Sequence, residues 1–110
     1  MGSDFNNALL AAINEIRVGD YGHEPLTLDS SWCAQSLAHA IEMAERGEMF
    51  HSCFGTEGVS ESTSSPRVMG IEFAAHISSI VTDARHSRLG IGSVKIGDKQ
   101  YTCVFSRKDY

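Results

Sequence analysis

The sequence predicts an α+β domain, in which a series of helices is followed by an antiparallel β-hairpin. Residues 5–18, 32–48 and 66–81 carry apolar side chains at spacings of three and four, the period of amphipathic helices. Residues 89–96 and 100–106 read as two strands joined by the turn sequence GDK, which is typical of a hairpin. Helices that come first and strands that come last favour the α+β class over alternating α/β folds.

The length and charge of the chain limit what it can be. Its 110 residues suit one domain, large enough to bury about two-thirds of its unfolded surface. We expect that domain to span residues 5–110, and we interpret residues 1–4 (MGSD) as a remnant of recombinant expression. The formal charge of −5 argues against nucleic-acid binding, because phosphate recognition needs a basic face. No apolar run approaches the ~20 residues of a transmembrane helix.

The first expected helix covers residues 5–18, with Asp4 as its N-cap. Its apolar stripe consists of Phe5, Leu9, Ile13 and Ile16, at spacings of four, four and three. Asn14 and Arg17 lie off this stripe. A turn-rich connector follows, because it contains Gly19, Gly22 and Pro25.

The second expected helix covers residues 32–48, with its cap among residues 29–31 and Gly47 near its end. Its predicted inner face consists of Cys33, Leu37, Ala40 and Ala44. Residues 55–65 show no period and are rich in Gly, Ser and Thr, so they are expected to form a loop. Pro66 is suited to the first position of a third helix that runs to Val81.

The expected loop is bounded by titratable side chains, which makes the stretch from His51 to His76 the candidate site. Two imidazoles and a carboxylate from separate segments can bind a divalent transition metal. They can also share protons as an acid–base set. Glu72 lies four residues before His76, on the same face of a regular helix, and is a further candidate ligand. His39 is expected to be a packing or hydrogen-bonded residue, and His23 and His86 to be surface loop residues.

The three cysteines, Cys33, Cys53 and Cys103, form no CxxC motif, so no structural zinc finger is predicted. Three single disulfide pairings, or none, remain open. Cys33 and Cys103 fall on apolar faces and are expected to be buried free thiols. Cys53 stands near His51 in the expected loop and is expected to be the most accessible thiol. A catalytic nucleophile is the alternative interpretation of this cysteine.

Several segments resemble the CAP superfamily, also called the SCP domain, which includes cysteine-rich secretory, pathogenesis-related and venom-allergen proteins. Residues 9–29 (LLAAINEIRVGDYGHEPLTLD) resemble the family's opening helix and connector. Residues 36–51 (SLAHAIEMAERGEMFH) resemble its second helix, which leads to a first cleft histidine. VSES resembles the place of a Gly-Glu-Asn motif, with Ser62 standing for the Asn. HISSIV followed by LGIG is similar to the second-histidine segment and its strand.

The resemblance implies an α-β-α sandwich, with helices packed on a small antiparallel sheet. It also implies a cleft formed by His51, Glu61 and His76, with Glu57 as the competitor of Glu61. His51 and His76 would then hold a divalent metal such as zinc, with Glu72 as an additional ligand. The family is secreted, so the resemblance implies an extracellular or periplasmic protein.

The favoured function is a secreted module that binds a protein or small-molecule partner. The alternatives are a metal-dependent hydrolase that uses the same His/Glu cleft and, by family analogy alone, a lipid or sterol binder. The sequence favours binding over catalysis, because none of its serines stands in a GxSxG elbow.

Overall fold

The structure is a computed structural model that describes residues 3–50, 56–61, 65–97 and 99–107. Within these residues the chain forms four helices and four strands, which confirms the α+β class. The elements are α1 (Ser3–Tyr21), β1 (Thr27–Leu28), α2 (Ser30–Arg46), β2 (Thr56–Glu61), α3 (Pro66–His76), α4 (Ser79–Thr82), β3 (Arg88–Ile96) and β4 (Lys99–Ser106).

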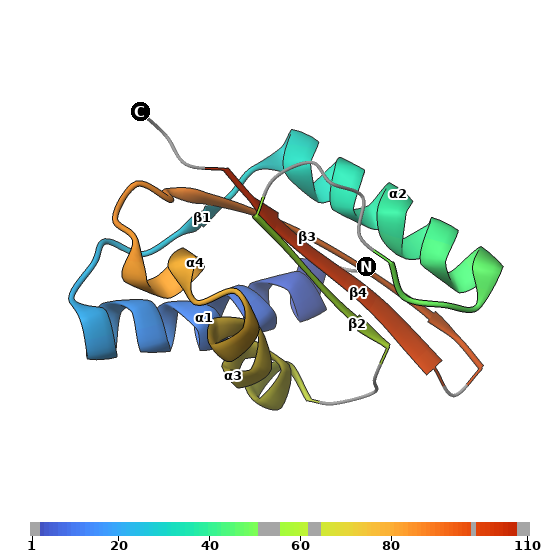
Figure 1. Cartoon of the computed structure of the whole chain (residues 1–110), viewed down its shortest axis with the longest axis horizontal. Helices are drawn as coiled ribbons and strands as arrows, with labels where there is room; N and C mark the ends of the chain where they lie inside the picture. The colour runs from blue at the N-terminus through green and yellow to red at the C-terminus, as the bar shows by residue number, and fades with distance from the viewer. Residues whose placement is uncertain (1–2, 51–55, 62–64, 98, 108–110) are drawn as a thin grey trace.

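The four strands form one sheet in the order β1-β3-β4-β2. β4 pairs antiparallel with both β3 and β2, whereas β1 pairs parallel with β3. The sheet is therefore mixed, where a wholly antiparallel sheet was expected. α2 covers one face of the sheet, and α1, α3 and α4 cover the other (Figure 1). This arrangement is the predicted α-β-α sandwich.

Two apolar cores fill the two sides of the sheet. The larger one lies between the sheet and α1, α3 and α4, and includes Leu9, Ile13, Met69, Phe73 and Val104. The smaller one lies beneath α2 and consists of Ala40, Met43, Tyr101 and Cys103. Successive β4 side chains thus enter opposite cores, as the strand period predicts. Among the described residues, none of the helices is long and apolar enough to span a bilayer.

The ends of α2 agree with the sequence, because both are set by local chemistry. The Asp29 carboxylate accepts a hydrogen bond from the backbone N–H of Trp32 and caps the helix. Gly47 ends it in the left-handed conformation, with φ of 68°. The buried face differs from the predicted one, since Leu37 is 42% exposed. Ala40 is buried as predicted, together with Ser36 and Met43, which flank the predicted face, and with His39.

Acid is expected to weaken the start of α2, because hydrogen bonds hold the pKa of Asp29 below its usual value. The Trp32 N–H is the largest cause, followed by Ser31 and, with a smaller effect, Arg88. A lowered pKa contributes stability above the unfolded pKa of about 3.9, and this stability is lost as pH falls through the folded pKa. We therefore expect urea unfolding of the wild type to depend more steeply on pH below about 4 than that of Asp29→Asn, which keeps a capping oxygen. Equal pH profiles would contradict this role.

Other helix boundaries correct the sequence-based predictions. α1 begins at Ser3, so Asp4 lies in its first turn instead of capping it. α1 also continues through Gly19 to Tyr21 and stops before Gly22, which has φ of 68°. Ser65 caps α3 and Pro66 opens it, as predicted. The expected third helix ends at His76, and a separate short helix, α4, begins at Ser79.

Residues 56–61 form strand β2, so the prediction of a continuous loop is wrong for this segment. Its sequence, TEGVSE, has no apolar alternation to indicate a strand. All six residues pair with β4, from Thr56 opposite Ser106 to Glu61 opposite Tyr101. Pairing with a distant segment therefore decides its conformation, which local propensity does not reveal.

His86 is wholly buried, so its assignment to the surface is wrong. One nitrogen of its ring, Nδ1, lies 2.6 Å from the hydroxyl of Ser106 on β4. Its backbone carbonyl accepts a hydrogen bond from the guanidinium of Arg17, which is also buried. These contacts tie the segment before β3 to the sheet and to α1. Cys103 is a buried free thiol as predicted, whereas the free thiol of Cys33 is only partly buried.

Candidate functional site

A cleft of about 670 Å³ runs between β2 and α3, and we call it the β2–α3 cleft. Its lining mixes carboxylate, imidazole and apolar side chains. The lining residues are Met49, Glu57, Gly58, Val59, Ser60, Glu61, Met69, Glu72, Phe73, His76 and Ile77.

The close approach of β2 to α3 depends on a glycine. A Cβ atom placed on Gly58 would lie 2.6 Å from Cδ1 of Phe73, which is inside contact distance. The strand can therefore lie against the helix only because this position has no side chain. Phe73 is buried beneath the strand and belongs to the larger core. One wall of the cleft is thus fixed to the core through α3.

The structure brings three of the sequence-predicted residues to this cleft. Glu72 and His76 both line it from α3, as expected for positions four apart on a helix. Glu61 lines it from the end of β2, where its Oε1 atom lies 2.9 Å from Nζ of Lys99. His51, the fourth predicted member, lies outside the described residues, as does Cys53.

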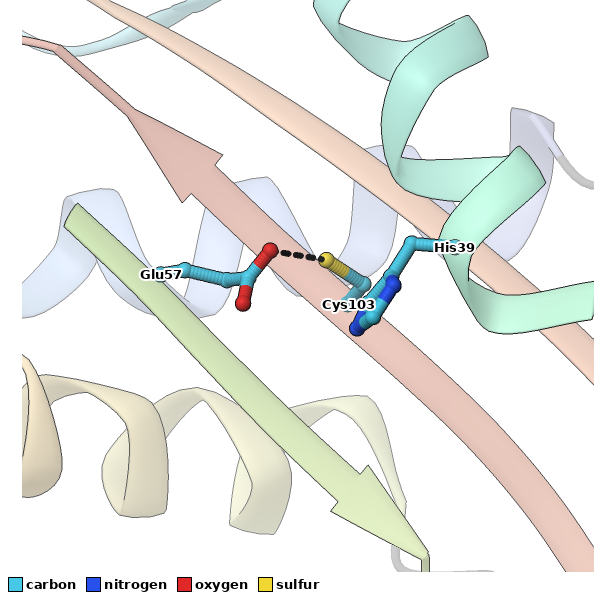
Figure 2. A group of neighbouring side chains, drawn as sticks. All are labelled: His39, Glu57 and Cys103. Atoms are coloured by element: carbon cyan, nitrogen blue, oxygen red, sulfur yellow. Dashed lines mark hydrogen bonds between the residues drawn. The ribbon is translucent and has the colours of Figure 1, made fainter. Parts of the chain in front are cut away.

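Glu57, the competitor of Glu61, also lines the cleft, but its carboxylate has a different environment. Its side chain lies on the α2 side of the sheet, next to the thiol of Cys103 on β4 (Figure 2). His39 of α2 completes a buried cluster, which we call the His39–Glu57–Cys103 group. The exposed fractions of these three residues are 4%, 8% and 1%. One ligand atom from each lies within 4.8 Å of the other two, so the group could hold a metal ion.

Strand register and helix orientation produce this cluster. Cys103 pairs with Val59 and Phe105 pairs with Glu57, so Glu57 and Cys103 are diagonal neighbours on the face that α2 covers. His39 lies on the buried stripe of α2 that packs against this face. Members from α2, β2 and β4 therefore meet, although 46 positions separate Glu57 from Cys103 in the chain.

Hydrogen bonds connect the members of the group to one another and to the chain around them. The Cys103 thiol donates to Oε2 of Glu57 over 3.6 Å. Burial raises the pKa of the Cys103 thiol far above its usual value, and the nearby negative charge of Glu57 raises it further. The His39 ring nitrogen Nε2 lies 2.5 Å from the carbonyl oxygen of Phe50, and its ring meets the Phe50 ring edge to face. The hydrogen-bonded role predicted for His39 is confirmed.

Sequence reasoning missed this group because it placed Glu57 in a loop. The alternation along residues 100–106 had already put Cys103 on an inward face. Without β2 as a strand, however, nothing indicated that a carboxylate lies beside that thiol. The missing information is the pairing of β2 with β4.

Comparison with known proteins identifies the fold. No protein-family profile matches the chain, and no curated protein matches it in sequence. An outer surface protein of Borrelia burgdorferi has a TM-score of 0.75 at 16% identity, covering 99% of this chain and 96% of that one. A hookworm platelet inhibitor has a TM-score of 0.71 at 14% identity, covering 100% and 72%.

An extracellular protein of Bacillus anthracis that contains an SCP domain has a TM-score of 0.58 at 15% identity. That match covers 93% of this chain and 41% of the Bacillus chain. Identities this low establish the fold alone. The CAP-type fold implied by the sequence motifs is therefore confirmed.

Proposed function

On the premise of this CAP-type fold, we propose that the chain is a secreted binding domain whose β2–α3 cleft takes a divalent cation. The proposal of secretion is supported by the outer-surface and extracellular descriptions of two proteins with the same fold. The observation that carries the binding role is the lining of the cleft. Its volume of about 670 Å³ falls in the range of small-ligand sites, roughly 300–1,000 Å³.

The charges of the cleft favour a cation. Glu61 and Glu72 border it from β2 and α3, and within the described part of the chain Glu61 forms an ion pair with Lys99 whereas Glu72 forms none. His76 lies one helical turn after Glu72 and adds an imidazole nitrogen ligand. A carboxylate and an imidazole on one helix face form half of a zinc coordination sphere. We propose His51, which lies outside the described residues, as a further ligand.

The apolar part of the lining gives the cleft a second property. Met69, Phe73 and Ile77 belong to or pack against the core and also border the cleft. A partner that combines an apolar group with a metal-binding or cationic group would therefore fit it. Metal-dependent hydrolysis and lipid binding, which the family resemblance also implied, have no specific contact in their favour among the described residues.

Zinc titration tests the cleft site. We expect the wild type to bind zinc with micromolar or tighter affinity in isothermal titration. A His51→Ala, His76→Ala variant should bind one equivalent of zinc fewer per chain. Affinity at this site should fall below about pH 6.5, because protonated imidazole is not a ligand. Glu72→Gln should lower the zinc affinity of the same site.

His23→Gln provides the matched control, since His23 lies outside the lining and contacts the Thr82 carbonyl oxygen instead. It should titrate like the wild type. Stoichiometry and affinity that are unchanged in the double variant would contradict the cleft site.

A further inference from the structure

We propose that the His39–Glu57–Cys103 group is an internal zinc site, separate from the cleft site of the preceding subsection. The three residues come from α2, β2 and β4 and meet on the face of the sheet that α2 covers (Figure 2). Glu57 also lines the β2–α3 cleft, so the internal site borders the cleft through this residue.

The ligand types suit zinc. Imidazole nitrogen, thiolate sulfur and carboxylate oxygen are the three donors that zinc uses in proteins. With the thiol and the carboxyl ionised, two negative charges neutralise Zn²⁺, and the neutral imidazole adds none. The loaded site carries no net charge, which matters because an uncompensated buried charge is costly.

The spacing is close to that of a coordination sphere. Zinc bonds of about 2.3 Å to sulfur and 2.0 Å to oxygen, at a tetrahedral angle, place the two ligand atoms roughly 3.5 Å apart. Cys103 Sγ and Glu57 Oε2 are separated by 3.6 Å. All three ligand atoms lie within 4.8 Å of one another, so side-chain movement on the order of 1 Å brings the set onto one ion.

The hydrogen bond of His39 to Phe50 orients its imidazole ring. A carbonyl oxygen only accepts hydrogen bonds, so the bond to Phe50 assigns the proton to Nε2 of His39. Nδ1 is then the ring nitrogen that would serve a metal. Histidine ligands in metal sites are oriented in this way, by donation from their other nitrogen to a carbonyl or carboxylate.

Ser36 supplies an independent observation. Its side chain is 2% exposed, and among the described residues its hydroxyl makes no hydrogen bond of full geometry, only an interaction with the Cys103 thiol. Hydrogen bonding in this interaction opposes the rise in the pKa of the Cys103 thiol, as the smallest of its causes. A metal-bound thiolate would accept a hydrogen bond from Ser36 and so satisfy this hydroxyl.

Binding must displace one proton from the Cys103 thiol, which at neutral pH is protonated and donates to Glu57. Zn²⁺ takes its place between the sulfur and the carboxylate, and the proton leaves to buffer. The described residues supply three ligands, so a fourth ligand such as water would complete the coordination sphere, as in other three-ligand zinc sites.

Cobalt is the sharpest probe, since a thiolate bound to Co²⁺ gives a charge-transfer absorption that oxygen and nitrogen ligands do not. The experiment uses the Cys33→Ser, Cys53→Ser protein, in which Cys103 is the remaining thiol. We expect this absorption to saturate at one equivalent of cobalt, with the visible bands of four-coordinate Co²⁺, and to disappear when zinc is added. Zinc should also raise the melting temperature of this protein.

Matched variants separate the internal site from the cleft site. Cys103→Ser should abolish the charge-transfer absorption, and His39→Gln should weaken cobalt binding by about 10-fold or more. His76→Ala and Glu72→Gln should leave the absorption unchanged, whatever they do to the cleft equivalent. A folded Cys33→Ser, Cys53→Ser protein without this absorption at saturating cobalt would overturn the internal site, even if zinc still binds in the cleft. An absorption that survives Cys103→Ser would overturn it as well.

Discussion

Replacing Gly92 with alanine is expected to lower the free energy of unfolding by about 3 kcal/mol or more. A Cβ atom on Gly92 would lie 2.0 Å from the backbone nitrogen of Leu37 and 2.3 Å from its Cα atom. These are main-chain atoms of α2, so no side-chain rotation can relieve the clash. The helix would have to move away from β3, which opens the smaller core around Ala40 and Met43.

Gly19→Ala is the matched control, because the same added methyl group meets no atom within 4 Å there. Gly19 lies inside α1, where alanine is favoured over glycine by about 1 kcal/mol, so this variant should be as stable as the wild type or more stable. Urea unfolding followed by circular dichroism compares the two. A Gly92→Ala protein as stable as Gly19→Ala would show that α2 does not rest on β3 at this distance.

The same glycine links the fold to the internal site. Leu37, whose backbone contacts Gly92, stands between Ser36 and His39 on α2. Gly90 of β3 acts similarly near the start of α2, since a Cβ there would lie 2.5 Å from the backbone of Trp32. The two glycines therefore set the distance between α2 and the sheet, and with it the distance from His39 to Cys103.

The parts of this fold that could be predicted from the sequence are those set by neighbouring residues. Asp29 and Gly47 define the limits of α2 through a capping carboxylate and a left-handed glycine. The β3–β4 hairpin follows from the turn at Gly97, which has φ of 63°. The α-β-α arrangement itself required the family resemblance, because periodicity indicates the elements and not how they stack.

The candidate site was harder to predict because it depends on long-range pairing. The sequence of β2 is typical of a loop, and only its pairing with β4 makes it a strand. The register of this pairing places the side chain of Glu57 toward α2. The buried face of α2 was misplaced for a related reason. Apolar content suggested that Leu37 points inward, but the glycine-lined surface of β3 brings the α2 backbone too close for it. Ser36 and His39 occupy the interior instead.

The burial of Arg17 was also not predictable from the sequence, because this residue lies off the apolar stripe of α1 and yet is only 1% exposed. Its guanidinium donates hydrogen bonds to four backbone carbonyls, at distances of 2.5–3.2 Å, from the connector before β1 and the segment around α4. The carbonyls belong to Glu24, Ile80, Asp83 and His86. Burial lowers the pKa of Arg17, and Asp83 opposes this effect, so the side chain stays charged at neutral pH.

Arg17→Met is therefore expected to lower the free energy of unfolding by about 3–5 kcal/mol, because several buried carbonyls lose their donor at once. Methionine keeps most of the side-chain length, so the loss reports the hydrogen bonds and the charge more than the packing. Arg17→Lys keeps the charge but has a single ammonium in place of the planar fork, so its loss should be intermediate. Guanidinium unfolding measures both, and hydrogen exchange at residues 80–88 shows where the loosening begins. If Arg17→Met exchanged as slowly as the wild type there, the polar interior of this fold would depend on contacts other than this guanidinium.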